Sequence, residues 1–294
     1  MVIVQLTGGL GNQMFQYAAA KSLASKKNTQ LILDISSFYR TEIPDLEVIR
    51  DFSLKKFSGV VEDTININNI ESSTDFSFLK EKKIEKILPR FKRSTFREKF
   101  YHFDKTFFKT NESVYLSGIW QSPKYFVNIQ HEIIQSFIFR ADIVNKVVAK
   151  ATEMRHSNSL SIHVRRGDYL RKPIILDWHG VMSKDYYLKA FDLISKRTQI
   201  DKVYYFSDEP EWVAEELIPH IPGEIVSDET SKSQYEDFYL LQNCQNQILA
   251  NSSFSWWAAY LNPNPNKIVV APKKWFLNAP NNTKDLFPEN WITI

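Results

Sequence analysis

The sequence predicts an α/β fold with two α/β halves, because strand, turn and helix patterns follow one another in two separate regions. Residues 2–6 are apolar, a glycine-rich turn follows, and residues 13–26 have helical spacing before a second apolar run at 31–34. Residues 160–164 alternate apolar and polar side chains with the period of a strand and lead into a second polar turn. Open α/β sheets bind ligands at the carboxyl ends of their strands, so both turns are candidate ligand sites.

The length of the chain, 294 residues, accommodates two domains of ordinary size. We place the boundary near residue 150, which gives an N-terminal domain of residues 1–150 and a C-terminal domain of residues 151–294. The segment 62–112 is rich in Asn, Ser, Lys and Phe, and we interpret it as a polar, partly helical insertion in the first domain.

The remaining elements follow from local patterns of apolar residues and helix-capping residues. We expect strands at 114–118, 202–206, 247–250 and 267–271, helices at 129–139, 142–156, 210–217 and 254–261, and a C-terminal tail that packs as loop.

Composition excludes several classes of protein. The hydrophobic fraction of 43% supports a core, and a net charge of +3 is too weak for general nucleic-acid binding. Cys244 is the single cysteine, so no intramolecular disulfide forms, and we expect a buried thiol. The N-terminus lacks the pattern of a signal peptide, and no apolar run approaches 18 residues. We therefore expect a cytoplasmic protein, with peripheral membrane contact left open as an alternative.

Two adjacent arginines, Arg165 and Arg166, follow the strand at 160–164. A guanidinium group holds phosphate oxygens through a planar fork and keeps its charge at any working pH. Gly167 gives a ligand room to approach the backbone, and His163 shares a strand face with Arg165. We interpret this segment as a diphosphate site, with an edge strand carrying two solvated cations as the alternative.

The glycine turn allows several interpretations. Gly9-x-Gly11 resembles a dinucleotide-binding fingerprint, and Asp34 stands where a ribose-binding acid is expected. The third glycine of that fingerprint is missing, and Asn12 and Gln13 supply amides that suit sugar hydroxyls. We favour a contact with the donor sugar, its phosphate or the acceptor; a purely structural turn and a nicotinamide site are the alternatives.

A third polar segment precedes the expected helix at 254–261. Asn251, Ser252 and Ser253 lie where the free amides and dipole of a helix N-terminus favour an anion, although a plain helix cap explains the same residues. We expect Trp256 and Trp257 to pack in the core. No metal or cofactor is expected, because no Asp-x-Asp occurs and His and Cys are few and scattered. No nucleophile elbow and no P-loop occur either.

Three segments in this order, 8–18, 163–168 with the pattern His-x-Arg-Arg-x-Asp, and 251–259, resemble bacterial α-1,2-fucosyltransferases of glycosyltransferase family 11. The resemblance extends from residue 8 to about residue 260. It implies a GT-B fold of two facing Rossmann-like domains, in which the C-terminal half binds GDP and the N-terminal half supplies the acceptor side.

The resemblance also implies a reaction. It is the inverting, metal-independent transfer of L-fucose from GDP-β-L-fucose to the 2-hydroxyl of a terminal β-galactoside, with an α-1,2 linkage in the product. The implied partners are GDP-fucose and a galactose-terminated glycan. A GT-B transferase for another nucleotide sugar, a nicotinamide-dependent oxidoreductase and a sugar-binding protein without turnover are the alternatives. The acceptor glycan and the oligomeric state cannot be read from the sequence.

Residue roles on the donor side follow from the same resemblance. His163 and Arg165 are expected to contact the diphosphate, and Arg166 to support the site or to bond neighbouring carboxylates. Asp208 is expected near the nucleotide, with helix capping as the alternative. Asp237 is expected to read guanine, with a surface charge on a helix as the alternative.

The base that removes the acceptor proton has two candidates, Asp168 and His179. Asp168 lies beside the arginines, which suits an ion pair that orients Arg166 better than proton transfer. His179 has a usual pKa of about 6.5, which suits general-base work. Late deprotonation with little help from a base is the third possibility.

Overall fold

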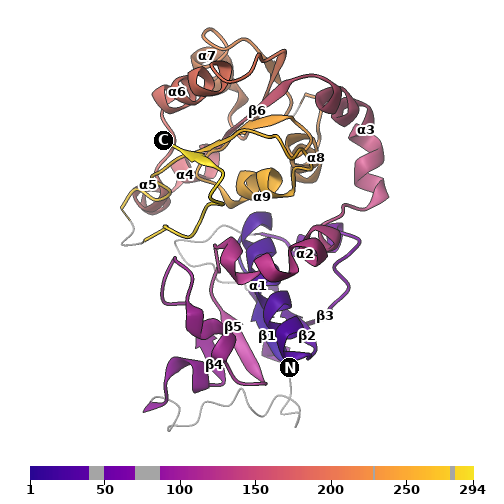
Figure 1. Ribbon diagram of the computed structural model, residues 1–294, viewed down its shortest axis with the longest axis vertical. Helices are drawn as coiled ribbons and strands as arrows, with labels where there is room; N and C mark the ends of the chain where they lie inside the picture. The colour runs from indigo at the N-terminus through magenta and orange to yellow at the C-terminus, as the bar shows by residue number, and fades with distance from the viewer. Residues whose placement is uncertain (40–49, 70–86, 228, 279–281) are drawn as a thin grey trace. The chain divides into compact units, whose positions relative to one another are not determined.

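The computed structural model describes residues 1–39, 50–69, 87–227, 229–278 and 282–294. The chain forms two compact units (Figure 1). The first unit comprises Met1–Ile138 and Asn281–Pro288, and the second comprises Phe139–Pro280 and Glu289–Ile294. Part of the expected insertion at 62–112, residues 70–86, lies outside the described residues.

The first unit contains a parallel sheet that has five strands among the described residues, in the order β3-β2-β1-β5-β4. The strands are β1 (Val2–Gln5), β2 (Leu31–Asp34), β3 (Asp63–Ile65), β4 (Thr95–Arg97) and β5 (Val114–Ser117). Helix α1 (Leu10–Lys27) connects β1 to β2 and is buried along most of its length. The strand order reverses direction between β1 and β5.

Shorter elements surround this sheet. They are α2 (Gln130–Ser136) and the 3₁₀ helices η1 (Ser36–Tyr39), η2 (Leu54–Lys56), η3 (Ile67–Asn69), η6 (Arg90–Lys92), η7 (Lys105–Lys109), η8 (Pro123–Tyr125) and η9 (Val127–Ile129).

The described part of 62–112 contains the 3₁₀ helices η3, η6 and η7, in keeping with a partly helical segment, but it also supplies the edge strands β3 and β4, which were not expected. Strands of three residues are too short for an alternating pattern to be seen in the sequence. The segment is also anchored in the core: the ring of Phe96 lies 5.9 Å from that of Trp120, and the ring of Phe107 lies 5.0 Å from it.

The second unit contains a parallel sheet with six strands in the described part of the chain, in the order β11-β10-β9-β6-β7-β8. The strands are β6 (Ser159–Val164), β7 (Lys202–Ser207), β8 (Glu224–Ile225), β9 (Asn246–Ile248), β10 (Val269–Ala271) and β11 (Ile292–Thr293). The chain builds outward from β6 to β8 and then returns to β9 on the other side of β6, which is the doubly wound order of a Rossmann fold.

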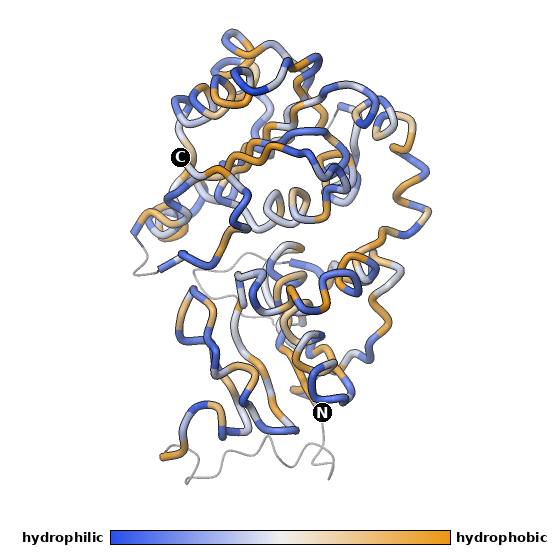
Figure 2. The backbone as a smooth tube through the Cα atoms, in the orientation of Figure 1, coloured by the Kyte–Doolittle hydropathy of each residue, from blue (hydrophilic) through white to orange (hydrophobic). Residues whose placement is uncertain are grey.

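Helices cover both faces of the second sheet (Figure 1). They are α3 (Ala141–His156), α4 (Gly167–Arg171), α5 (Pro173–His179), α6 (Lys184–Ser195), α7 (Pro210–Glu216), α8 (Gln234–Leu241) and α9 (Ser253–Leu261). Leu160, Ile162 and Val164 of β6 belong to one buried cluster with Tyr187 and Ile194 of α6. The alternation of apolar and polar residues in β6 therefore separates the face that packs on α6 from the opposite face. Figure 2 shows the hydrophobic colour along the central strands of this sheet.

The boundary between the two units lies between Ile138 and Phe139, whereas the sequence predicted it near residue 150. Helix α3 follows this point, and it packs against α8 and β6 of the second unit. A segment near the C-terminus returns to the first unit, where Ser122 donates a hydrogen bond to the Asp285 carbonyl at 2.7 Å. The tail also contributes β11 to the second sheet, where loop alone was expected.

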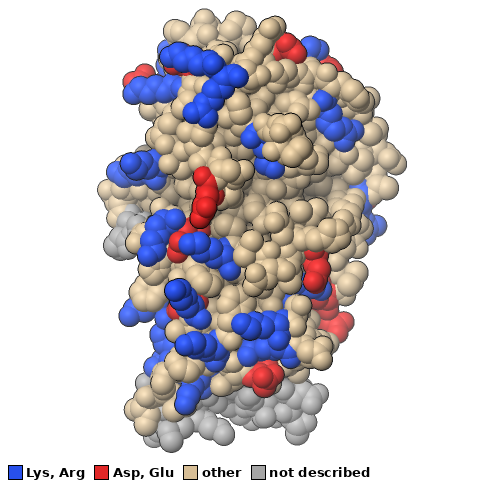
Figure 3. Space-filling model, viewed as in Figure 1, with Lys and Arg blue, Asp and Glu red and all other residues tan. Residues whose placement is uncertain are grey.

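Several packing predictions are confirmed. Cys244 is buried, and burial raises the pKa of its thiol to about 12. Trp256 and Trp257 are both fully buried. Across the described residues, we find no helix that combines the length and the apolar character needed to cross a membrane. Basic side chains gather on the visible face over the β4 region of the first unit (Figure 3), where 87–112 supplies many lysines and arginines.

Candidate functional site

The two turns that meet at the reversal of the second sheet form the candidate donor site. Strand β6 ends at Arg165 and Arg166, and its neighbour β9 leads through Asn251 into α9. The hydroxyl of Tyr169 donates to the Asn251 carbonyl at 3.3 Å and so links the two turns. In doubly wound sheets, ligands bind outside the carboxyl ends of the strands at this reversal.

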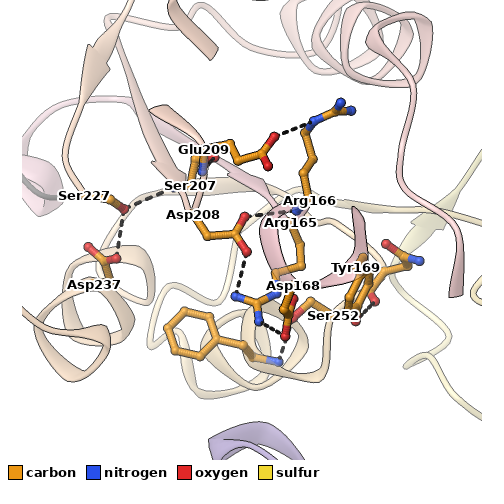
Figure 4. Close-up of polar contacts among 12 residues, drawn as sticks. Arg165, Arg166, Asp168, Tyr169, Ser207, Asp208, Glu209, Ser227, Asp237 and Ser252 are labelled. Carbon is orange, nitrogen blue, oxygen red and sulfur yellow. Dashed lines mark hydrogen bonds and ion pairs between the residues drawn. The ribbon is translucent and has the colours of Figure 1, made fainter. Parts of the chain in front are cut away.

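Arg165 is held between two carboxylates. Its Nη2 lies 2.6 Å from Asp168 Oδ2, and its Nη1 lies 3.0 Å from Asp208 Oδ2 (Figure 4). Burial lowers the pKa of the Arg165 guanidinium, but the charges of Asp208 and Asp168 outweigh it and raise the pKa overall. The side chain is therefore charged and fixed from two elements, the first turn of α4 and the loop after β7.

Arg166 is held differently. Its Nε lies 3.3 Å from Glu209 Oε2, and its guanidinium carbon lies 4.2 Å from the centre of the Trp212 ring. Its backbone N–H donates to Asp208 Oδ1 at 2.9 Å, so one carboxylate joins both arginines. Asp168 was expected to orient Arg166, but it pairs with Arg165, because α4 begins at Gly167 and places Asp168 one helical turn from Arg165.

This arrangement corrects two expectations about the arginine segment. The two guanidinium groups face three carboxylates, those of Asp168, Asp208 and Glu209, so neither arginine is an uncompensated cation. A Cβ on Gly167 would lie only 3.0 Å from Asp208 Oδ2. The space beside Gly167 is thus filled by the Asp208 carboxylate in the structure.

Asp208 does not cap α7. The N-cap of that helix is Glu209, which makes no side-chain cap hydrogen bond, and the Asp208 carboxylate points to the arginines instead. Glu209 and Trp212 were not singled out in the sequence. The signal that could have indicated them is their spacing, since residues three apart at a helix start face the same neighbour, here Arg166.

His163 lies on the opposite face of β6 from the α6 cluster. It is buried, and its ring stacks on Phe254 of α9 with 5.5 Å between centroids. Burial and, secondarily, the charge of Arg165 hold the pKa of His163 well below its usual value. Its Nδ1 finds no hydrogen-bond partner among the described residues. His163 is therefore a neutral imidazole that can still donate or accept one hydrogen bond.

His179 ends helix α5 and lies between two rings, 4.8 Å from Tyr169 and 5.4 Å from Phe276. Burial lowers its pKa to about 4, although Asp168 acts in the opposite direction. The expected pKa near 6.5 is therefore wrong, because the imidazole is packed among aromatic rings rather than solvated. A group with this pKa is a weak base at neutral pH.

The start of α9 combines a structural amide with capping hydroxyls. Asn251 is buried, and its Nδ2 donates to the carbonyls of His179 at 2.9 Å and Gly180 at 3.2 Å. Ser252 is the N-cap, with its Oγ accepting from the Phe254 N–H at 3.3 Å, and Ser253 begins the helix. Asn251 thus fixes the neighbouring loop, whereas the N-terminus of α9 supplies the dipole that favours an anion.

Asp237 of α8 is not a free surface charge. It accepts a hydrogen bond from Ser227 Oγ at 2.8 Å (Figure 4). It accepts another from the Ser231 hydroxyl. Ser227 Oγ in turn accepts from the Ser207 N–H at 3.0 Å, at the end of β7. The carboxylate is therefore fixed near the carboxyl edge of the second sheet.

The glycine turn of the first unit is mainly structural at Gln13. Its Nε2 donates to the carbonyls of Gly8 at 2.8 Å and Asp51 at 2.9 Å, and its Oε1 accepts from the Ser53 N–H at 2.8 Å. Both N–H donors are used and the side chain is fully buried, so a sugar hydroxyl cannot reach it. This corrects its assignment as a donor contact.

The other turn residues lie at the start of α1. Gly9 is its N-cap in an extended conformation, and Gly11 is buried in its first turn. Asn12 is only partly buried, and its Oδ1 accepts a hydrogen bond from Gln121 Nε2 at 3.1 Å. Asn12 is thus the amide of this turn that reaches the surface.

Asp34 is fully buried and has no free capacity for a ribose. Its Oδ2 accepts from the Tyr115 hydroxyl at 2.6 Å, and its Oδ1 accepts from the Ser36 N–H at 3.0 Å. The acid that a nicotinamide site would require is therefore a structural carboxylate joining β2 to β5.

A family model described as "Glycosyl transferase family 11" matches residues 1–294. The chain belongs to glycosyl transferase family 11. A relative from Escherichia coli, "O-antigen biosynthesis glycosyltransferase WbnK", is 32% identical over 98% of this chain and 99% of its own length. "Alpha-1,2-colitosyltransferase" from the same organism is 29% identical over 100% of this chain and 99% of its own length. "Galactoside alpha-(1,2)-fucosyltransferase 1" of Saimiri boliviensis boliviensis is 29% identical over 50% of this chain and 42% of its own length.

Solved structures agree with the fold of this family 11 member. Fucosyltransferase NodZ from Bradyrhizobium superposes with a TM-score of 0.52 at 16% identity, covering 89% of this chain and 92% of that one. A mutant of Arabidopsis thaliana FUT1 in complex with GDP gives a TM-score of 0.52 at 11% identity, and the match covers 93% of this chain and 71% of that one. The fold is that of GT-B glycosyltransferases, with two parallel α/β sheets as the sequence predicted.

Family membership identifies the chain as a glycosyltransferase, in place of the nicotinamide-dependent oxidoreductase considered from the glycine turn. In the part of the chain that the structure describes, no group of three or more His, Cys, Asp or Glu side chains could hold a metal ion. Arg165, His163, Asp168 and Asp208 lie together at the carboxyl edge of β6 and β7.

Proposed function

We propose that this family 11 member transfers L-fucose from GDP-β-L-fucose to the 2-hydroxyl of a terminal β-galactoside. The product linkage is α-1,2, so the anomeric carbon inverts in a single displacement. The observation that carries the proposal is Arg165, fixed by Asp168 and Asp208 where the strand order of the second sheet reverses, in a chain of this family.

The second unit binds GDP in this proposal. Arg165 and the N-terminus of α9, with Ser252 and Ser253, hold the diphosphate, and neutral His163 adds one hydrogen bond. Asp237 accepts from N1–H and the 2-amino group of guanine, in exchange for its bonds to Ser227 and Ser231. Adenine cannot supply those two donors.

The chemical task of Arg165 is to stabilise charge on the leaving GDP. A guanidinium has five N–H donors, and the two ion pairs leave others for phosphate oxygens. Because the side chain is already fixed, little reorganisation accompanies the reaction, which is the condition under which such donors are most effective. Asp208 and Asp168 act as positioning residues, and Arg166 strengthens the site through its contacts with Glu209 and Trp212.

Metal independence is part of the proposal. The guanidinium of Arg165 and the positive N-terminal end of the α9 dipole stabilise the diphosphate charge, as a divalent cation does in other glycosyltransferases. No cofactor is required, because GDP-fucose itself is the donor substrate.

A second donor is favoured by one specific comparison. The relative named as an α-1,2-colitosyltransferase matches this chain over its whole length at 29% identity, so a GDP-activated deoxy sugar related to fucose is the alternative donor. The O-antigen relative makes a polysaccharide repeat unit a suitable acceptor class. The cytoplasmic location expected from the sequence stays a prediction.

The test is acceptor-dependent release of GDP. The protein is mixed with GDP-fucose or GDP-colitose and a panel of β-galactosides, in the presence of EDTA, beside the Arg165→Ala variant. Release that requires a galactoside, survives EDTA and vanishes in the variant supports the proposal. Release from GDP-colitose alone would replace the donor, and failure to release GDP with any pair would contradict the proposed function.

A further inference from the structure

The segment 87–112 of the first unit carries the excess positive charge of the chain. It contains seven Lys and Arg and three Asp and Glu, a net charge of +4, whereas the whole chain carries +3. Basic side chains gather on the visible face over the β4 region (Figure 3). The rest of the chain is therefore close to neutral.

Three short elements of this segment pack together. Helix η6 contacts both β4 and η7. Arg90 of η6 joins them, because its Nη1 lies 3.0 Å from Asp104 Oδ2 at the start of η7 and its Nη2 donates to the Arg97 carbonyl of β4. Since β4 is an edge strand among the described residues, this cluster lies at the margin of the first sheet.

The cluster exposes several cations that have no counter-charge. None of them forms an ion pair with another described residue. We call them the basic patch, and its members are the exposed side chains of Lys92, Arg97, Lys99, Lys105 and Lys109.

Two carboxylates lie between these cations in the sequence, and both are engaged elsewhere. Asp104 pairs with Arg90. The Glu98 carboxylate accepts from the backbone N–H of Ile119 at 2.6 Å and of Trp120 at 3.1 Å. Burial also raises the pKa of Glu98 to about 7, although these amides and the charge of Arg90 act against this. Neither acid therefore neutralises the basic patch.

Exposed lysines of the second unit are arranged differently, because carboxylates accompany them. A surface that serves solubility alone carries both signs of charge interspersed, and the second unit follows that pattern. Its ion pairs join Lys146 to Glu236, Lys150 to Glu224, Lys184 to Glu216, Lys196 to Asp192 and Lys202 to Glu153.

An exposed aromatic ring lies beside the basic patch. Phe100 is 38% exposed, and the centre of its ring lies 5.3 Å from Lys99 Nζ and 5.8 Å from the guanidinium carbon of Arg90. Charged side chains on an edge strand prevent pairing with other strands. That role accounts for Arg97 of β4, but not for the cations of η7 or for an exposed ring among them.

An anionic lipid surface fits these features. It attracts clusters of basic side chains, each of which strengthens binding by about fivefold. Binding also grows with the apolar area that enters the interface, which the ring of Phe100 supplies. A neutral glycan fits less well, because sugar hydroxyls need acceptors as well as donors, and the cations of the basic patch only donate.

We propose that the basic patch, together with Phe100, docks the first unit on a membrane that contains anionic lipids. The lysine and arginine side chains then lie at the level of the lipid phosphates, and the ring of Phe100 enters the headgroup region. This inference does not depend on the identity of the donor or of the acceptor.

The test is sedimentation of the full-length protein with lipid vesicles. One set consists of phosphatidylcholine alone and the other of phosphatidylcholine mixed with phosphatidylglycerol. We expect binding to the mixed vesicles only. It should weaken as NaCl is raised from about 0.1 M to about 1 M, because the Debye length falls from about 10 Å to about 3 Å.

The double variant Arg97→Gln with Lys99→Gln removes two cations of the basic patch. Its affinity for mixed vesicles should fall by about 25-fold, which is about fivefold for each side chain. Phe100→Ala should weaken binding by a smaller factor, since only part of the ring is exposed. If the first double variant fails to fold, Lys105→Gln with Lys109→Gln repeats the test in η7.

Lys189→Gln with Lys196→Gln is the matched control, because both lysines are exposed on or beside α6 and the change in net charge is the same. It should bind mixed vesicles like the unmodified protein. An equal loss in the control and in the patch variant would overturn the inference, as would equal binding to both sets of vesicles. Binding to soluble polyglutamate without binding to mixed vesicles would replace the membrane by an acidic polymer.

Discussion

The carboxyl edges of the two sheets differ in charge. In the second unit, two arginines and three carboxylates lie within one network around Arg165 and Asp208. In the first unit, the described residues at the carboxyl edge include the amides of Asn12 and Gln121 and the carboxylates of Asp34 and Glu98. Both edges lie where strand order reverses, so the fold offers two ligand positions of different chemistry.

This difference indicates a division of labour. A network of fixed charges is suited to a diphosphate, whose own charge grows as it leaves. Amides, which offer both donors and acceptors, are suited to the hydroxyls of a neutral acceptor. We therefore expect a substitution at one edge to affect only the ligand of that edge.

The largest effect is expected at Arg165. Replacing it with alanine removes the donor that stabilises the leaving GDP, and loss of one such donor typically lowers kcat by about 10²–10³-fold. Steady-state kinetics with a saturating donor would measure this. Arg140→Ala is the matched control, because Arg140 is exposed and pairs only loosely with Asp142 at 3.4 Å. Equal rates for the two variants would remove Arg165 from the mechanism.

A somewhat smaller loss is expected for Asp208→Asn. Asparagine keeps the acceptor for the Arg166 N–H but loses the ion pair that fixes Arg165. Misplacement of a catalytic group by about 1 Å can lower the rate by about 10²-fold. The same assay on Asp192→Asn, an exposed carboxylate paired with Lys196, should show no change. A wild-type rate in Asp208→Asn would mean that Asp168 alone orients the arginine.

Gln13 should affect stability rather than binding. Alanine there leaves the Ser53 N–H without its acceptor and two carbonyls without their donor, and an unsatisfied buried group costs about 1–3 kcal/mol. Chemical denaturation should show this loss while the Kd for GDP stays unchanged. The exposed Gln135 is the control, with an expected change within about 0.5 kcal/mol for Gln135→Ala. Weaker GDP binding without a stability loss would restore Gln13 as a donor contact.

The smallest effect concerns His179. Its pKa of about 4 in the folded protein lies below the unfolded value of about 6.5, so the unfolded chain binds a proton first as pH falls. The stabilising contribution of the neutral ring is complete above pH 6.5 and is lost between about pH 6.5 and 4. With partial solvent screening, we expect about 1–2 kcal/mol.

His179→Phe should flatten that pH dependence while keeping kcat, because the ring packs between Tyr169 and Phe276 without acting as a base. Unfolding measured between pH 4 and 7 would test the first point, and kinetics at pH 7 the second. A large fall in kcat at unchanged stability would return His179 to the candidate bases.

Local patterns were sufficient to predict much of this molecule. The alternation at 160–164 gave β6, and Asn251–Ser253 marked the start of α9, because both signals lie within a few residues. The edge strands β3 and β4 were missed, since three residues show no periodicity.

Contacts between distant residues could not be predicted from local patterns. Asp208 lies about forty residues along the sequence from the arginines it joins, and Gln13 is separated from Ser53 by a similar number of residues. The Glu98 carboxylate accepts from the Ile119 N–H in the turn after β5. Such pairings depend on how strands are ordered in the sheet. For that reason the residue types at the carboxyl edge of the second sheet were predictable, whereas their partners required the structure.

The most direct test of the proposed donor site is calorimetric titration of GDP into the unmodified protein, Arg165→Ala and Arg140→Ala, with kcat measured on the same samples. Only Arg165→Ala should lose turnover and bind GDP more weakly, by about tenfold or more. Wild-type GDP affinity and turnover in Arg165→Ala would contradict the assignment of the donor to the carboxyl edge of the second sheet.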